Sequence, residues 1–241
     1  MTEPFYDLLP GRSLGPHYEI IEFLGSGWEG EVYKVQERLT GIVRAAKLFY
    51  ERRGMRKEPL LRYARKLYKL RSCPIIIQYH HRGVARLRKK QVEFLVSDFS
   101  DGEMLSIFLA RQKKKSLPSF EALHLFYALT LGVEQIHFLG EYHGDIHSDN
   151  VMVARRGLGF DVHLLDFFDL GRPTKEKIQY DVYDMITILY EMIGETDGYR
   201  RTDSNIKQII KGRKHSLISQ CYKNAGHLRL TLENLDWETG L

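Results

Sequence analysis

The hydrophobic patterning changes near Asp101-Gly102, and this change constrains the fold more than any other feature of the chain. Before it, short β-rich runs follow one another at residues 18–24, 31–36, 42–50, 75–79 and 92–97. One helical stripe interrupts them between Pro59 and Arg71, with Pro74 just beyond its end. After Gly102 helical spacing predominates. The sequence therefore predicts an α+β protein of two lobes: an antiparallel β-sheet with one helix, and a mostly helical lobe.

The second half of the chain has its own order of elements. Helices are predicted at 104–112, 120–139 and 180–193, with one or two more in the tail from Asn205. A polar loop at 142–150 follows the longest helix and precedes two short strands, 151–154 and 162–165, joined by a turn at 156–159. We place the lobe boundary between Asp98 and Phe99. The prediction is a single domain, 1–241, divided into lobes 1–98 and 99–241.

Composition narrows the class of protein. The 241 residues are 43% hydrophobic and 28% charged, which is ordinary for a globular chain and argues against disorder. The net charge is +5, with basic clusters at 52–53, 86–90, 113–115 and 211–214. We interpret these clusters as solvated surfaces and not as a nucleic-acid site, because they lack interleaved aromatic residues and zinc-ligand spacing.

The cysteines and the apolar segments of the chain indicate in which cellular compartment the protein is expected. Cys73 and Cys221 lie far apart and form no Cys/His pattern, so we expect neither a disulfide framework nor a structural zinc site. The first ten residues have no apolar core of a signal peptide, and no apolar run is long enough to span a bilayer. These features predict a soluble cytoplasmic protein.

Glycines cluster between the first two predicted strands. Residues 25–32 read Gly-Ser-Gly-Trp-Glu-Gly-Glu-Val, a G-x-G-x-x-G-x-V pattern. Glycines let a backbone turn tightly and bring its N–H groups close to phosphate oxygens. Because the motif lies between two strands, and not between a strand and a helix, it does not fit a dinucleotide-binding fingerprint. A glycine-rich hairpin without a ligand is the alternative interpretation.

A lysine lies in the middle of the third predicted strand. Lys47 shares a strand face with Val43, Ala45 and Phe49, because side chains alternate along a strand. A lysine on a mostly apolar face needs an anionic partner. An edge-strand lysine whose ammonium reaches water is the alternative.

The polar loop carries the most informative residues. Within His143-Gly144-Asp145-Ile146-His147-Ser148-Asp149-Asn150, Asp145 precedes Asn150 by five positions. A carboxylate here can orient a hydroxyl nucleophile and accept its proton, and an amide oxygen can bind a metal. A metal cluster built on the histidines, or a polar loop without ligands, are alternative interpretations.

An aspartate ends the last predicted strand. Asp166 shares a face with Val162 and Leu164, so the strand carries a carboxylate to its own end, a suitable position for a Mg²⁺ ligand. Asp169 competes for the role. Choosing Asp169 would leave Asp166 inside an apolar run, so we favour Asp166.

In this order, the glycine loop, the strand lysine, the H-x-D-x₄-N loop and the strand-end aspartate resemble the protein-kinase superfamily, from about Tyr18 to Ile193. The resemblance implies a two-lobed kinase fold and an ATP- and Mg²⁺-dependent phosphotransferase. It implies Asp145 as catalytic base, with Lys47 on the α/β-phosphates and Asn150 and Asp166 as Mg²⁺ ligands. It also implies that ATP is bound by Gly25, Gly27, Gly30, Val32, Ala45, Lys47, Ser97 and Phe99.

The chain departs from the family pattern at several positions. The helix has no clear glutamate to pair with Lys47, since Glu58 precedes Pro59. Gly144 replaces an arginine, and His147 replaces a lysine. Only about fifteen residues separate Asp166 from Asp181, the helix aspartate that the resemblance places beneath the catalytic loop. The peptide-docking segment of ordinary kinases is therefore reduced.

Three hypotheses follow. The first is a compact bacterial Ser/Thr protein kinase that transfers the γ-phosphate of ATP to a protein hydroxyl. The second is a small-molecule or lipid kinase similar to aminoglycoside and lipopolysaccharide phosphotransferases. The third is a pseudokinase that acts as a binding scaffold, which the retained Lys47, Asp145, Asn150 and Asp166 oppose.

Overall fold

The computed structural model describes residues 6–27, 29–50, 58–167, 171–211, 213–214, 217 and 220–235. Its contacts divide the chain into two units. Unit 1 comprises Met1–Arg71 and Ile77–Ser100, and unit 2 comprises Ser72–Ile76 and Asp101–Leu241.

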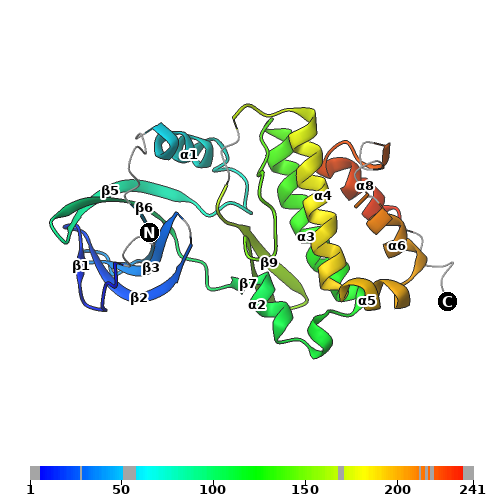
Figure 1. Ribbon diagram of the computed structural model, residues 1–241, viewed down its shortest axis with the longest axis horizontal. Helices are drawn as coiled ribbons and strands as arrows, with labels where there is room; N and C mark the ends of the chain where they lie inside the picture. The colour runs from blue at the N-terminus through cyan, green and yellow to red at the C-terminus, as the bar shows by residue number, and fades with distance from the viewer. Residues whose placement is uncertain are drawn as a thin grey trace. The chain divides into compact units, whose positions relative to one another are not determined.

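Unit 1 is built on a six-stranded antiparallel sheet (Figure 1). The strand order is β1-β2-β3-β4-β6-β5. The strands are β1 (Ser13–Leu14), β2 (Tyr18–Ser26), β3 (Gly30–Glu37), β4 (Val43–Phe49), β5 (Tyr79–Leu87) and β6 (Lys90–Asp98). Helix α1 (Glu58–Lys69) packs on the edge strand β5. The predicted antiparallel sheet with one helix is confirmed.

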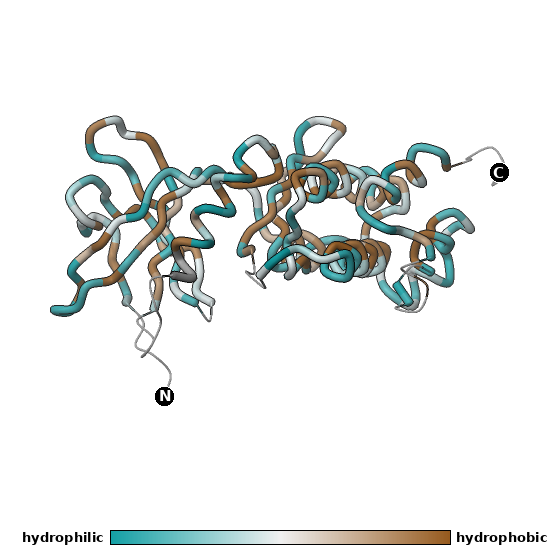
Figure 2. Tube along the Cα trace, turned by 90° about the horizontal axis from the view of Figure 1, so that it is seen from above, coloured by the Kyte–Doolittle hydropathy of each residue, from teal (hydrophilic) through white to brown (hydrophobic). Residues whose placement is uncertain are grey.

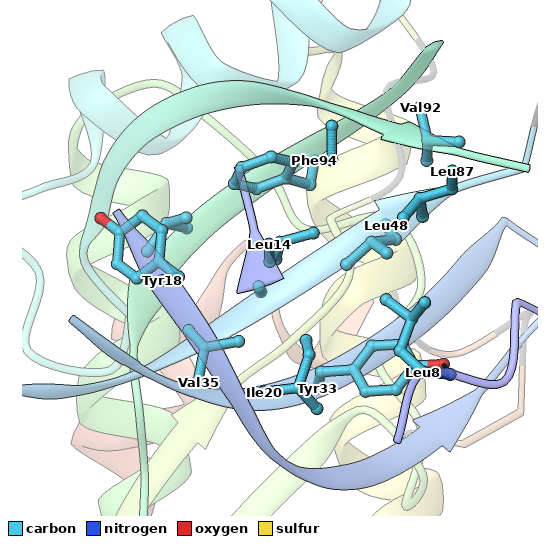
Figure 3. Packing of buried hydrophobic residues seen from close by; sticks show 13 residues of the cluster. Leu8, Leu14, Tyr18, Ile20, Tyr33, Val35, Leu48, Leu87, Val92 and Phe94 are labelled. Carbon is cyan, nitrogen blue, oxygen red and sulfur yellow. Dashed lines mark hydrogen bonds between the residues drawn. The ribbon is translucent and has the colours of Figure 1, made fainter. Parts of the chain in front are cut away.

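One face of this sheet is a closed hydrophobic core. Alternate residues of β3, β4 and β6 are almost completely buried on it, and the N-terminal segment adds Leu8 and Leu14. Figure 3 shows Leu14 of β1 among the side chains that the longer strands contribute. Each such side chain stabilises the fold by roughly 1.5–3 kcal/mol. This face is used for packing, which leaves the opposite face for a site.

The predicted strand at 75–79 is wrong, and β5 begins where that prediction ended. Ile75 and Ile76 belong to unit 2, where the Ile75 carbonyl accepts from the Leu164 N–H at 2.9 Å. A Cβ built on Gly132 would lie 2.4 Å from the Ile75 Cδ1, so the isoleucine packs directly on a helix backbone. The apolar run therefore packs on a helix of unit 2 and pairs with Leu164 through Ile76, instead of joining the sheet of unit 1.

Unit 2 combines helices with a small three-stranded sheet, β7-β8-β9. Its strands are β7 (Glu103–Met104), β8 (Val151–Arg156) and β9 (Gly159–Leu164). Its helices are α2 (Leu105–Ala110), α3 (Ser119–Phe138), α4 (Lys175–Met192), α5 (Glu195–Arg201), α6 (Ser204–Lys211) and α8 (Ala225–Glu233), with a 3₁₀ turn at Lys113–Lys115. The tail carries α6 and α8, as expected, whereas α5 was not predicted.

Helices α3 and α4 form the centre of unit 2. They lie side by side in Figure 1, and α8 packs on α3. Hydrophobic stretches run through the helices of this unit as well as through the strands of unit 1 (Figure 2). Helix α4 starts five residues earlier than predicted, because Thr174 caps it by accepting from the Lys177 N–H at 3.3 Å. Among the described residues, no helix combines the length and apolar character needed to cross a membrane.

Candidate active site

The residues predicted to bind a nucleotide in unit 1 share one face of the sheet. In the antiparallel register Gly25 lies opposite Val32, and Val32 lies opposite Lys47. On β6, Ser97 lies opposite Ala45. Directly opposed residues project from the same face. This face is the one turned away from the core, whose members include Tyr33, Ala46 and Leu48.

The glycine motif forms a tight hairpin between β2 and β3. The Gly27 N–H donates to the Gly30 carbonyl at 2.9 Å, which closes the turn. A Cβ on Gly30 would lie 1.9 Å from the Leu48 carbonyl oxygen, so this position requires glycine because two backbones approach closely. No atom of the described residues lies within 4 Å of a Cβ on Gly25 or Gly27. The first two glycines therefore leave one side of the hairpin open.

The strand lysine has a carboxylate partner within unit 1. Lys47 Nζ lies 2.7 Å from Glu29 Oε2, and the two side chains are 15% and 30% exposed. Its ammonium also lies 5.7 Å from the centre of the Phe49 ring. The side chain of Glu58, the weak helix candidate, lies outside the described part of the chain. Sequence reasoning did not identify Glu29 as the partner of Lys47. An acidic residue inside the glycine motif at residues 25–32 is a signal that could have indicated it.

A second glutamate supports the hairpin from the core face. Glu31 is fully buried and accepts from the backbone N–H of Tyr6 at 2.7 Å and from the hydroxyls of Tyr33 and Tyr50. Burial and the bond to Glu31 raise the pKa of Tyr33. A buried carboxylate needs such donors. Sequence reasoning missed Glu31, which alternation places on the core face with Tyr33.

The last two residues predicted for unit 1 lie at the end of β6, where Ser97 belongs to the strand and Phe99 follows it. The Ser97 hydroxyl donates to the Asp98 carbonyl at 3.3 Å, and Asp98 also binds Arg44 and His80. Lys34 Nζ lies 4.3 Å from the centre of the Phe99 ring, a cation–π contact.

In unit 2 a buried aspartate on α4 positions the polar loop at residues 142–150, which carries the predicted catalytic residues. Asp181 accepts from the backbone N–H groups of His143 at 2.6 Å and Gly144 at 2.8 Å. It also binds His137 Nε2 at 3.1 Å. Because His137 Nδ1 accepts from the Ala225 N–H, its Nε2 carries the proton that Asp181 accepts. The expected bracing role of Asp181 is confirmed.

His143 connects this loop to the end of β9. Its Nδ1 accepts from the Asp145 N–H at 3.2 Å and its Nε2 donates to the Leu165 carbonyl at 2.8 Å, which fixes a neutral tautomer. The buried ring lies 4.3 Å from the Phe167 ring. Both ring nitrogens are therefore engaged in hydrogen bonds, and the residue positions the loop.

Asp145 and Asn150 are brought together as predicted from their spacing. Asn150 Nδ2 donates to the Asp145 carboxylate at 3.1 Å and to its carbonyl at 2.9 Å. Asn150 is buried, whereas about half of the Asp145 side chain is exposed. His147 Nε2 lies 3.6 Å from the Asp145 carboxylate. Both hydrogen bonds use the Asn150 side-chain nitrogen, and they orient an accessible carboxylate.

A further carboxyl group lies behind this loop. Burial, followed by the charges of Asp181 and Asp145, raises the pKa of Asp184 to about 7. A weaker opposing effect comes from the hydrogen bond of the Ile146 backbone. Sequence reasoning did not identify Asp184, because its burial and the contributions of Asp145 and Ile146 depend on the loop at residues 142–150, far away in the sequence.

Asp166 follows β9 by two residues and has a left-handed backbone, with φ of 52°. The Leu165 N–H donates to the Asn150 carbonyl at 2.9 Å, so the strand end is fixed to the loop that carries Asn150. Asp169, the alternative metal ligand, and Phe168 lie outside the described residues. Carboxylate and amide oxygens are the donors that Mg²⁺ takes in proteins, so Asp166 and Asn150 fit this ion.

The segment before α4 is held by two side chains. The Tyr142 hydroxyl donates to the Gly171 carbonyl at 3.2 Å. Lys177 Nζ donates to the Arg172 carbonyl at 2.9 Å and to the Tyr142 hydroxyl at 3.3 Å. The predicted site residues thus form two groups, one within each unit.

Comparisons with known proteins point to one family. A family model described as "Protein kinase domain" matches residues 18–187. The putative cyclin-dependent kinase F-2 of Oryza sativa subsp. japonica is 31% identical over 153 residues, which cover 62% of this chain and 46% of that protein. CBL-interacting protein kinase 29 of the same plant is 32% identical over 168 residues, covering 65% and 36%. The chain spans less than half the length of these relatives.

Among solved structures, the kinase domain of PknI from Mycobacterium tuberculosis has a TM-score of 0.71 to this chain. The likeness covers 94% of this chain and 98% of that domain, at 19% sequence identity. At this identity the likeness concerns the fold.

Proposed function

The chain belongs to the protein kinase family, and from this premise we propose that it is an ATP- and Mg²⁺-dependent kinase that phosphorylates serine or threonine hydroxyls of a protein. The observation that carries the proposal is the pair formed by Asp145 and Asn150 on a loop that Asp181 holds by its backbone. This arrangement presents an accessible carboxylate in a fixed orientation. Such preorganisation accounts for most of the catalysis in phosphoryl transfer.

Each group has a proposed role. Asp145 accepts a hydrogen bond from the acceptor hydroxyl and takes its proton as the oxygen attacks the γ-phosphorus, while the bond from this phosphorus to the β,γ-bridging oxygen breaks and ADP leaves. Lys47 binds phosphate oxygens through its ammonium. The glycine hairpin covers the phosphates, while Val32, Ala45, Ser97 and Phe99 line the rest of the nucleotide site. Asp166 and Asn150 would hold Mg²⁺, which supplies charge neutralisation on the phosphates.

The acceptor class is the finer part of the proposal. The likeness to curated protein kinases supports a protein acceptor. The short segment between β9 and α4 favours a small-molecule acceptor as the second candidate, because it offers little surface for a peptide. A cytoplasmic location, a bacterial origin, the absence of nucleic-acid binding and the lobe boundary at Asp98 stay predictions.

Incubation with γ-labelled ATP and Mg²⁺ tests the proposal. The purified chain is assayed alone, with a generic protein acceptor such as casein, and with aminoglycoside and sugar acceptors. Label on protein hydroxyls supports the proposed activity, and label on a small molecule supports the second candidate. Transfer to none of them, by a chain that binds ATP, would favour a scaffold. Asp145→Asn serves as the matched inactive control.

A further inference from the structure

We propose that the Glu29 carboxylate competes with phosphate for the ammonium of Lys47. By forming an ion pair with this lysine, Glu29 lowers the affinity of the site for nucleoside triphosphates. This inference rests on the proposed function, because it assumes that Lys47 binds phosphate. It assigns to one residue of the glycine hairpin a role in setting nucleotide affinity.

Glu29 is fixed at both its backbone and its side chain. Its carbonyl accepts from the Tyr50 N–H at 2.9 Å, beside the turn closed by Gly27 and Gly30. Its carboxylate Oε2 lies 2.7 Å from Lys47 Nζ. The two side chains are mostly shielded from water, which strengthens an ion pair relative to an exposed one. The folded hairpin therefore places a carboxylate on the ammonium.

The position of Glu29 in the glycine hairpin determines whether its carboxylate leaves Lys47 accessible to phosphate. A carboxylate that only orients a lysine must approach from a direction that leaves the phosphate side open. Glu29 instead comes from the hairpin that would cover the phosphates, and Lys47 lies in the same cross-strand row as Gly25 and Val32. A carboxylate and a triphosphate on one ammonium repel each other. The nucleotide must therefore displace Glu29.

The described side chains of helix α1, at residues 61–69, include no carboxylate. This part of the helix carries Arg62, Arg65, Lys66 and Lys69. Glu31, two residues along the hairpin, lies on the core face and binds tyrosine hydroxyls and the Tyr6 N–H. Of the two hairpin glutamates, only Glu29 contacts the lysine in the described part of the chain.

Titration calorimetry of the full chain tests the inference. Wild type, Glu29→Gln and Glu29→Ala are titrated with ATP in Mg²⁺ and, separately, with adenosine, which has no phosphates. Both variants should bind ATP roughly tenfold more tightly, the factor that corresponds to one charge-assisted hydrogen bond, with adenosine affinity unchanged. Glu22→Gln, which removes the same charge from an exposed position on β2, is the matched control and should not change either affinity.

The outcomes separate this inference from the proposed function. Unchanged or weaker ATP binding in the Glu29 variants, with ATP binding intact in wild type, overturns the inference and leaves the proposed function standing. Tighter binding of adenosine as well as ATP also overturns it, because the effect would not involve the phosphates. Failure of wild type and variants to bind either compound refutes the proposed function and the inference with it.

Discussion

Replacing the carboxylate of Asp145 or Asp166 should lower activity while the fold stays intact. Asp145 is half-exposed, and Asp166 has a left-handed backbone that asparagine tolerates well. We expect Asp145→Asn and Asp166→Asn each to lower phosphoryl transfer by about 10²–10⁴-fold, since one loses the proton acceptor and the other a Mg²⁺ ligand. Turnover and thermal melting are measured together. Asp161→Asn, on the exposed side of β9, is the control. Full activity in Asp166→Asn would move the metal site towards Asp169.

Lys47→Met should weaken ATP binding more than it lowers stability. The ammonium contributes charge to phosphate oxygens, whereas its partner Glu29 is partly exposed and can be hydrated when the lysine is removed. ATP affinity, turnover and the melting temperature are compared with those of Lys90→Met, whose lysine is exposed at the start of β6. Unchanged affinity and turnover would refute the nucleotide site proposed for unit 1.

Asp184 should make stability depend on pH. Its pKa in the folded chain is about 7, above its ordinary value of 3.8. The folded chain therefore keeps a proton that the unfolded chain has already lost, and this group's contribution to stability falls as pH rises from about 4 to 7. Asp184→Asn should raise the melting temperature, with a gain that grows between pH 4.5 and 7.5. Asp197→Asn, an exposed change on α5, should show no such trend. A gain of equal size at all pH values would contradict the assignment.

At the scale of elements, substitutions in the glycine hairpin can test whether the close approach of the Gly30 and Leu48 backbones requires glycine. Gly30→Ala would place a Cβ 1.9 Å from the Leu48 carbonyl oxygen, and we expect it to cost about 3 kcal/mol or more of unfolding free energy. Gly25→Ala meets no atom of the described residues within 4 Å and should change stability by less than about 1 kcal/mol. Urea unfolding of both variants measures the difference. Equal destabilisation would show that the two backbones can separate at little cost.

Elements with strong periodicity could be predicted from the sequence, and elements defined by distant partners could not. Helix α3 was predicted to within one residue at each end, because its apolar residues recur at helical spacing. Strand β5 was missed, since its first four residues are polar or aromatic and its register depends on pairing with β6. The neighbouring Ile75 and Ile76 read as a strand because apolar runs look alike whether they pack against a sheet or a helix.

At the scale of the whole molecule, the order of the motifs was sufficient to predict the two-part architecture. The site residues with family counterparts could be proposed in advance, because each occupies a fixed place relative to a strand or helix, and their roles stay predictions. Residues that act through contacts from distant segments, such as Glu31 and Asp184, could not be found in this way. Glu31 depends on Tyr6, and Asp184 depends on Asp145, both far away in the sequence.

The way in which unit 2 holds its site predicts that the enzyme is active without phosphorylation of the segment before α4. Gly144 has a φ of 89° and offers no side chain to pair with a phosphate, while Asp181 already fixes its backbone. The described part of the segment is held by Tyr142 and Lys177. The Thr174 hydroxyl is engaged in capping α4. Order that phosphorylation supplies in other kinases is therefore supplied here by unmodified residues.

Activity assays on phosphatase-treated enzyme test this prediction. Thr174→Ala and Tyr180→Phe are assayed alongside, because these are the two hydroxyl-bearing residues between Asp166 and Asp181. Treated wild type should keep its turnover, and so should both variants. Thr174→Ala should lose about 1 kcal/mol of stability, because its helix loses an N-cap. Local pairing of a phosphate with Arg172 or Lys175 is the alternative. It predicts that dephosphorylation abolishes turnover and that a phosphate on Thr174 restores it, and this pair of results would refute the role assigned to Gly144.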